Sequence, residues 1–172
     1  TGYNGKDPAD VTVTNQDNDT AGITVSQTSG LTTTEALGTA SFSVVLTSQP
    51  TANVTIGLSS SDTTEGTVSP ASLTFTSANW STAQTVTVTG VNDLVVDGNI
   101  AYTIVTAAAV SSDPNFNGKD PADVSVINQD NDIAGITVSP IDGLVTTEAG
   151  VSASFTVVLT SQPSANVSIG LS

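Results

Sequence analysis

The chain has 172 residues and 16 acidic side chains against two lysines, which gives a formal net charge of −14. This charge argues against nucleic acids and anionic membrane surfaces as partners, because both are bound through Lys and Arg. Cysteine and histidine are absent, which excludes disulfides, thiolate sites, the commonest zinc ligand and the commonest general base. No apolar run approaches the length of a membrane span, so we expect no membrane insertion of this segment.

Short runs in which apolar residues alternate with Thr and Ser predict half-buried β-strands. The run at 40–46, for example, has Phe42, Val44 and Leu46 on one face. Seven such runs are expected as strands: 22–26, 40–46, 53–58, 72–75, 84–90, 101–105 and 123–127. Seven strands in a chain segment of this size match an immunoglobulin-like domain. The predicted fold class is therefore all-β, a seven-stranded immunoglobulin-like Greek-key sandwich.

The sequence repeats itself with a fixed offset of 113 residues. "NGKDPADVTVTNQDND" begins at Asn4, and "NGKDPADVSVINQDND" begins at Asn117. A fixed period defines the folding unit, and this one is domain-sized, so we predict a tandem array of sandwiches. The predicted boundaries are 1–19 for the C-terminal strand of a preceding repeat, 20–132 for a complete repeat, and 133–172 for the N-terminal strands of a following repeat. The chain is then an excerpt from a longer array, which is typical of an exported surface protein.

Acidic residues gather in connections that an odd number of strands brings to one end of the sandwich. If each connection reverses the chain, the first, third and fifth loops lie at the same end as the close of the last strand. These segments carry seven carboxylates: Glu35, Asp62, Glu65, Asp93, Asp97, Asp130 and Asp132. Such crowding is repulsive without a cation, and Ca²⁺ accepts a flexible set of carboxylates, carbonyls and waters. We therefore predict Ca²⁺ as the cofactor, held where "QDND" ends one unit and "GITVS" begins the next.

In their order and spacing, these motifs resemble the Calx-beta family, which occurs in sodium/calcium exchangers and in very large bacterial surface proteins. The resemblance covers the whole unit: a Glu before "ASFSVVL", an Asp after the third strand, "TVTVTGVND" before an acidic loop, and a closing "DND". It implies a calcium site at one end of a seven-stranded sandwich, with the ligands Glu35, Asp62, Asp93, Asp97, Asp130 and Asp132. Asn92 stands where the exchanger pattern usually has a second Asp, so the number of ions stays open. The Thr/Ser-rich texture is closer to giant bacterial adhesins than to an animal exchanger.

Several features also have a purely structural interpretation. "NQDND" alone could be a turn, because Asp and Asn side chains bond nearby backbone amides. Glu65 is expected to be a solvated acid, and Trp80 is expected to cap the other end of the core. The segment 111–123 is expected to be an ordered hairpin loop with a positive φ after Asn117. Alternatively, this loop abuts the acidic end of the preceding unit.

We expect a calcium-stabilised structural extender of a long, secreted bacterial surface or adhesion protein. We expect no enzyme, because the chain has neither a histidine for a catalytic triad nor a Gly-rich phosphate loop. The expected partners are neighbouring repeats of the same chain. Two alternatives stay open: self-association of the repeats into an extracellular fibre or sheath through Thr-rich edge strands, and a calcium sensor of the exchanger type.

Overall fold

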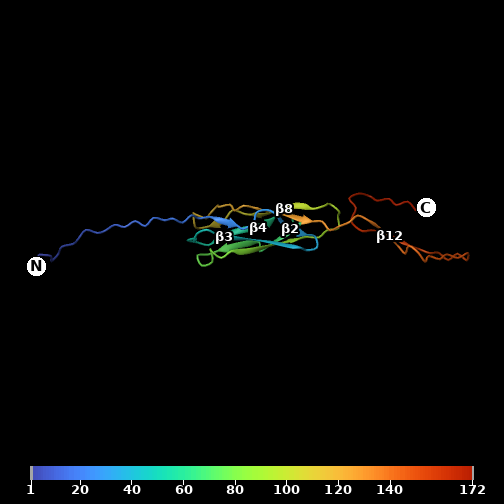
Figure 1. The fold of residues 1–172 in the computed structure, drawn as a ribbon, viewed down its shortest axis with the longest axis horizontal. Helices are drawn as coiled ribbons and strands as arrows, with labels where there is room; N and C mark the ends of the chain where they lie inside the picture. Colours follow the sequence, from blue (N-terminus) through green and yellow to red (C-terminus); the bar gives the residue numbers. More distant parts are fainter. Residues whose placement is uncertain (1, 172) are drawn as a thin grey trace.

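A computed structural model describes residues 2–171, which form a β-sandwich flanked by an N-terminal segment and a small two-stranded sheet (Figure 1). The strands of the sandwich are β1 (Ile23–Val25), β2 (Leu31–Thr34), β3 (Thr39–Leu46), β4 (Val54–Ser60), β5 (Gly66–Ser69), β6 (Ser72–Phe75), β7 (Gln84–Gly90), β8 (Ile100–Thr106), β9 (Val110–Ser111) and β10 (Val124–Gln129). The small sheet consists of β11 (Ile136–Ser139) and β12 (Thr156–Leu159). The predicted all-β sandwich is confirmed. None of the described residues belongs to a helix that could cross a membrane.

Two sheets enclose the core of the sandwich. One has the order β1-β3-β7-β5, and the other has the order β2-β10-β8-β4-β6, with β9 also paired to β4. Alternation along each strand sends one set of side chains inward, as in β3, where Phe42 and Leu46 are 3% exposed and Val44 is fully buried. Because all seven predicted runs lie in strands, the alternating pattern identified the core-forming segments correctly.

The predicted count of seven strands is too low, because β2, β5 and β9 are additional. The run of β2 has one apolar residue, Leu31, and therefore gives no alternating signal. Its Thr33 nevertheless points inward, where the hydroxyl lies 3.0 Å from the Tyr102 hydroxyl. Strand β5 pairs with β7 in the first sheet, and the chain then crosses to the second sheet, where β6 pairs with β4.

Strand directions determine which connections share an end of the sandwich. Strand β10 runs parallel to β2, whereas the other strand pairs of the sandwich are antiparallel. The chain therefore enters at one end and leaves at the other, as predicted (Figure 1). We call the exit end, formed by 35–38, 61–65, 91–99 and the residues after Gln129, the acidic pole. The opposite end, formed by 47–53, 76–83 and 112–123, is the basal pole.

The basal pole is closed by ordered loops. Trp80 packs against the core there, as predicted, and Phe116 is 1% exposed. The Asp113 carboxylate accepts the Thr51 amide at 2.8 Å and the Asn115 amide at 2.9 Å. Gly118 has a φ of +77°, so the predicted tight turn after Asn117 is confirmed. Two loops of this pole are thus tied together by one carboxylate.

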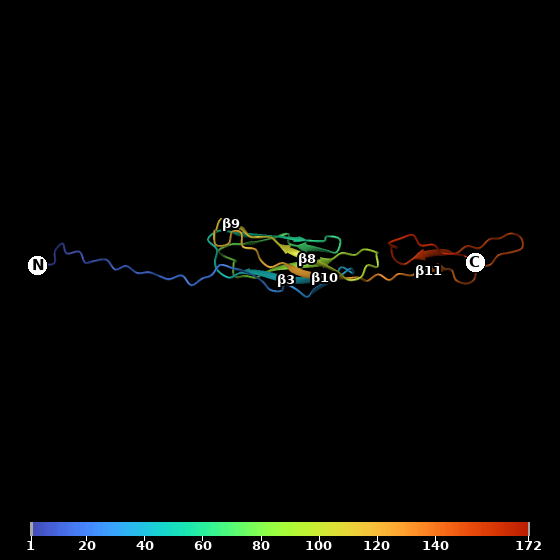
Figure 2. The same ribbon diagram turned by 90° about the horizontal axis from the view of Figure 1, so that it is seen from above.

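Residues 133–171 repeat one strand pairing of the sandwich. Ile136 of β11 lies opposite Leu159 of β12, just as Ile23 of β1 lies opposite Leu46 of β3. Both partners are displaced by the same 113 residues, so the sequence repeat is also a repeat of strand register. The sandwich and the small sheet follow one another along the long axis of the molecule (Figure 2). The domain boundaries at 19 and 132 stay predictions.

Candidate metal centre

The parallel pairing of β2 with β10 brings two acidic segments together. Thr34 and Gln129 are register partners at the ends of these strands. The next residues, Glu35 and Asp130, therefore leave the sheet side by side at the acidic pole. The Glu35 amide donates to the Gln129 carbonyl at 3.1 Å, which continues the ladder by one step.

Six carboxylates at the acidic pole fall into three overlapping groups. The groups are Glu35–Asp93–Asp132, Glu35–Asp97–Asp130 and Glu65–Asp93–Asp97, and within each group one oxygen per residue lies within 4.8 Å of the others. Two oxygens bound to the same Ca²⁺ at 2.3–2.6 Å can be up to about 5 Å apart. The spacing therefore fits hard, oxygen-preferring divalent cations. We call these six residues the carboxylate cluster.

Two members of the cluster are buried in the sandwich. Glu35 is 2% exposed and Glu65 is 6% exposed. Burial is the main cause that raises the pKa of Glu35 above its ordinary 4.5; the Asn131 amide opposes this, and the charge of Asp130 adds to it. Burial likewise raises the pKa of Glu65, against the opposing hydrogen bond from Asn128. In the absence of a cation, both side chains resist ionisation.

Lysine side chains do not neutralise the cluster. The two lysines of the chain are Lys6, in the N-terminal segment, and Lys119, in a loop of the basal pole. Arginine and histidine are absent from the sequence. The acidic pole therefore has no basic side chain of its own to balance its charge.

Backbone amides hold the aspartates of the cluster in place. Asp130 accepts the amides of Asp132 at 2.7 Å and Gly98 at 2.8 Å, and these bonds hold the pKa of Asp130 below its ordinary value. Asp93 accepts the Val95 amide at 2.7 Å. The Asp132 Oδ2 atom is buried and has no hydrogen-bond partner among residues 2–171. A buried carboxylate oxygen without a partner is costly, and a bound cation would satisfy it.

Asn128 connects the cluster to the core. Its side chain is 1% exposed. The side-chain amide donates to Glu65 at 3.3 Å and to the Val91 carbonyl at 3.0 Å, and its oxygen accepts the Thr33 hydroxyl at 3.0 Å. Gly90 leaves room for this network, because a Cβ there would meet Asn128 Oδ1 and the Thr34 carbonyl.

We predict that Asn128→Ala lowers the free energy of unfolding by about 2–4 kcal/mol, because it leaves several buried polar groups without partners. Urea unfolding of the metal-free protein measures this. The matched control is Asn15→Ala, at the position 113 residues earlier, which lies in the exposed N-terminal segment. Equal stability of the two variants would contradict the role of the network.

The structure brings together five of the six predicted ligands: Glu35, Asp93, Asp97, Asp130 and Asp132. Asp62 belongs to none of the groups found among the described residues. Its Oδ1 accepts the hydroxyl and the amide of Thr64, at 2.6 Å and 3.0 Å. The expectation that Glu65 is solvated is wrong, because its side chain is buried beside Asn128. Whether these carboxylates bind an ion stays a prediction.

One signal in the sequence could have pointed to Glu65. Val124, Val126 and Asn128 alternate along β10, so Asn128 faces the same way as two core valines. A buried amide requires hydrogen-bond partners. The acidic residues of neighbouring loops were the available candidates, and Glu65 is the one that the fold brings within reach.

Comparisons with known proteins found likenesses among solved structures. No protein-family model and no curated protein matches the chain. The chain is similar to the apo form of the Calx CBD1 domain, with 15% identity over 64% of this chain and 98% of that one, and a TM-score of 0.47. It is also similar to the E. coli chaperone DraB (7% identity, 68% and 59% covered, TM-score 0.44). A third likeness is to domains 1–6 of the surface layer protein SbsC, with 18% identity over 87% of this chain and 22% of that one, and a TM-score of 0.36. The fold assignment itself rests on the strand pairing described above.

Proposed function

We propose that this chain is a calcium-binding structural module of a tandem array, in which Ca²⁺ stiffens the junction between successive sandwiches. The module would act as an extender of a secreted bacterial surface or adhesion protein and would have no catalytic role. Its partners would be neighbouring units of the same chain.

The observation that carries this proposal is the position of the carboxylate cluster. Asp132 belongs to the cluster. The residue that follows it, Ile133, accepts a hydrogen bond from Thr160, which lies just after β12 of the following copy. An ion on Asp132 would therefore bind the exact point at which one unit passes into the next. The Asp132 Oδ2 atom, which is buried and has no hydrogen-bond partner among residues 2–171, adds an oxygen that such an ion would satisfy.

The loop between β7 and β8 would connect the ion to the junction in a second way, because it carries two aspartates of the cluster and also contacts the following copy. Each of the three carboxylate groups contains Asp93, Asp97 or both. Between them, the Leu94 carbonyl accepts the Gln162 amide of the following copy at 2.6 Å. Neutralising the two aspartates would fix this loop, and with it the contact to the next unit. The expected consequence is a straighter and less flexible chain of sandwiches.

The affinity needed for this role is modest. Calcium-binding modules outside cells commonly have dissociation constants of about 10⁻⁴ to 10⁻³ M, so millimolar extracellular calcium would keep the junctions occupied. Where calcium is scarce, the buried Glu35 and its neighbouring aspartates would repel one another, and the junction would be loose.

We predict that calcium raises the melting temperature of the full 172-residue chain. At a concentration of 100 times the dissociation constant, one site adds about 2.7 kcal/mol to the free energy of unfolding. For a chain of this size that corresponds to about 5–11 °C. Thermal unfolding followed by circular dichroism in EDTA and in 10 mM calcium chloride measures the effect.

Magnesium at the same concentration is the control, because its strict octahedral preference suits this irregular oxygen set poorly. Equal melting temperatures in EDTA and in calcium would refute the proposal. Light scattering of the same samples separates the two structural roles. An extender stays monomeric when calcium is added, whereas a self-assembling fibre subunit increases in mass.

A further inference from the structure

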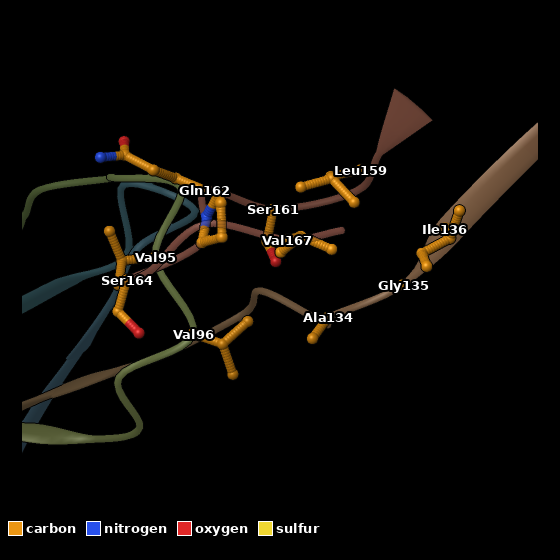
Figure 3. Close-up of a pocket in the computed structure, with 11 residues that line it drawn as sticks. Val95, Val96, Ala134, Gly135, Ile136, Leu159, Ser161, Gln162, Ser164 and Val167 are labelled. Carbon is orange, nitrogen blue, oxygen red and sulfur yellow. The ribbon is translucent and has the colours of Figure 1, made fainter. Parts of the chain in front are cut away.

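A short backbone contact joins the sandwich to the following copy. Val95, in the loop between β7 and β8, forms a parallel bridge with Gln162, whose amide donates to the Leu94 carbonyl at 2.6 Å. Val95 and Val96 line a groove together with Ser161 and other residues of the following copy (Figure 3). The loop that carries Asp93 and Asp97 therefore also reaches across to the next unit.

The receiving surface of this contact occurs twice in the chain. In the following copy it includes Ala134, Ser161, Gln162 and Ser164. The residues 113 positions earlier are Ala21, Ser48, Gln49 and Thr51. These four also line a groove, at the basal pole of the complete sandwich. The two grooves thus share four equivalent positions of the repeat.

The two sites differ in what fills them. At the first groove, the Gln162 amide has the Leu94 carbonyl as its acceptor. At the basal pole, the backbone amide of Gln49 has no acceptor among residues 2–171, although its side-chain amide donates to the Ser77 carbonyl at 2.8 Å. The adjacent Thr51 amide is held by Asp113 at 2.8 Å. The basal groove therefore has a backbone segment fixed by Asp113, and this segment presents the backbone amide of Gln49 as a hydrogen-bond donor without an acceptor among residues 2–171.

The N-terminal segment reaches the same place. Asp17 and Asp19 line the basal groove beside Asp113 and Phe116. By the repeat, Asp17 and Asp19 correspond to Asp130 and Asp132, which belong to the carboxylate cluster of the complete unit. The residues that close a cluster in one unit thus lie beside the open groove of the next.

We infer that the basal pole is a docking surface for the Leu94–Val96 loop of a second copy of this unit. The loop would lie against 48–51, with Val95 bridged to Gln49 and the Gln49 amide donating to the Leu94 carbonyl. This inference rests on the tandem arrangement of the proposed function, but not on the ion. Each unit would then carry a donor loop at its acidic pole and a receiving groove at its basal pole.

Disulfide trapping in a lengthened chain tests the docking. Residues 20–132 are duplicated in place, so that 1–132 is followed by 20–172, and the new junction reads Asp132–Thr20. The first copy carries Val95→Cys and the second carries Gln49→Cys; the natural chain has no cysteine. Residues bridged through their backbones have Cα atoms within disulfide range. We expect the cross-link to form at least about tenfold faster than in the control pair.

The control pair combines Val95→Cys in the first copy with Thr63→Cys in the second, because Thr63 is exposed and lies at the far pole of its own copy. Val95→Cys with Gln162→Cys in the natural chain reports the rate for the contact seen here. A Val95–Gln49 rate equal to that of the Thr63 control would overturn the docking. A rate similar to that of the Gln162 pair would support it.

Hydrogen exchange gives a second measurement without cysteines. Thr51→Ser in the second copy, the residue found at position 164, distinguishes the two copies of the peptide by mass. Docking is expected to slow exchange of the Gln49 amide in the second copy by about tenfold relative to the first, and equal rates would overturn it. Repeating the trapping in EDTA separates the two proposals. An unchanged cross-linking rate there supports docking and counts against calcium as the cause of junction order.

Discussion

Glu35→Gln is expected to weaken calcium binding to this chain about a hundredfold, which is about 2.7 kcal/mol. Glu35 belongs to two of the three carboxylate groups, so its loss removes a charged ligand from both. The same change should stabilise the metal-free protein, because the burial that raises the pKa of Glu35 no longer opposes a charge. Calorimetric titration measures the affinity, and thermal unfolding in EDTA measures the second effect. Opposite signs in the two assays are the signature of a buried metal ligand.

Two matched variants make this result specific. Glu148 is the counterpart of Glu35 in the following copy, where it is exposed and outside the three groups. Glu148→Gln should leave the affinity within about twofold. Asp62→Asn should also change it little, because Thr64 already occupies the Asp62 carboxylate. If Glu35→Gln had no larger effect than these two, calcium would not bind at the carboxylate cluster.

The fold was predictable wherever burial produces a period of two. All seven alternating runs became strands because their inward residues fill one core between two sheets. Strand β2 escaped prediction for a physical reason: Thr33 faces inward but is satisfied by the hydroxyl of Tyr102 and by Asn128. Hydrogen bonds between distant segments take the place of apolar burial at Thr33, so the sequence near β2 shows no alternating pattern that would predict the strand.

The candidate site was predictable to the extent that chain direction decides it. Counting reversals of the chain is enough to send Glu35, Asp93 and Asp130 to one pole. The same count cannot distinguish Asp62 from Glu65, which are neighbours in one loop. The choice depends on a local bond from Thr64, which engages Asp62, and on the distant Asn128, which draws Glu65 inward. Only the assembled fold contains both facts.

The stability of the metal-free protein is expected to fall as pH rises above about 4.5, and calcium should reverse this trend. Burial raises the pKa of Glu35 and of Glu65 above 4.5 in the folded chain. Between the unfolded and folded pKa values, the folded state then holds more protons than the unfolded state. Linkage makes the free energy of unfolding decrease with pH in that window, by at most about 1.4 kcal/mol per pH unit for each carboxyl.

Other carboxylates set the acidic limit of the curve. Hydrogen bonds from the amides of Asp132 and Gly98 hold the pKa of Asp130 below 3.8. Its stabilising contribution is present above that value and is lost as the pH falls through the folded pKa. The metal-free chain should therefore be most stable near pH 4 to 5, between the two effects.

Calcium is expected to reverse the pH dependence, because on the proposed function it would bind the ionised carboxylates. Its stabilising effect grows as Glu35 and Glu65 lose their protons, so at 10 mM calcium the free energy of unfolding should rise between pH 5 and 7. Urea unfolding at a series of pH values, in EDTA and in calcium, measures both curves. The double variant Glu35→Gln, Glu65→Gln should flatten the metal-free curve and remove most of the calcium response. If the free energy of unfolding of the metal-free protein rose with pH between 5 and 7, burial would not be raising the pKa of the two glutamates in the folded chain.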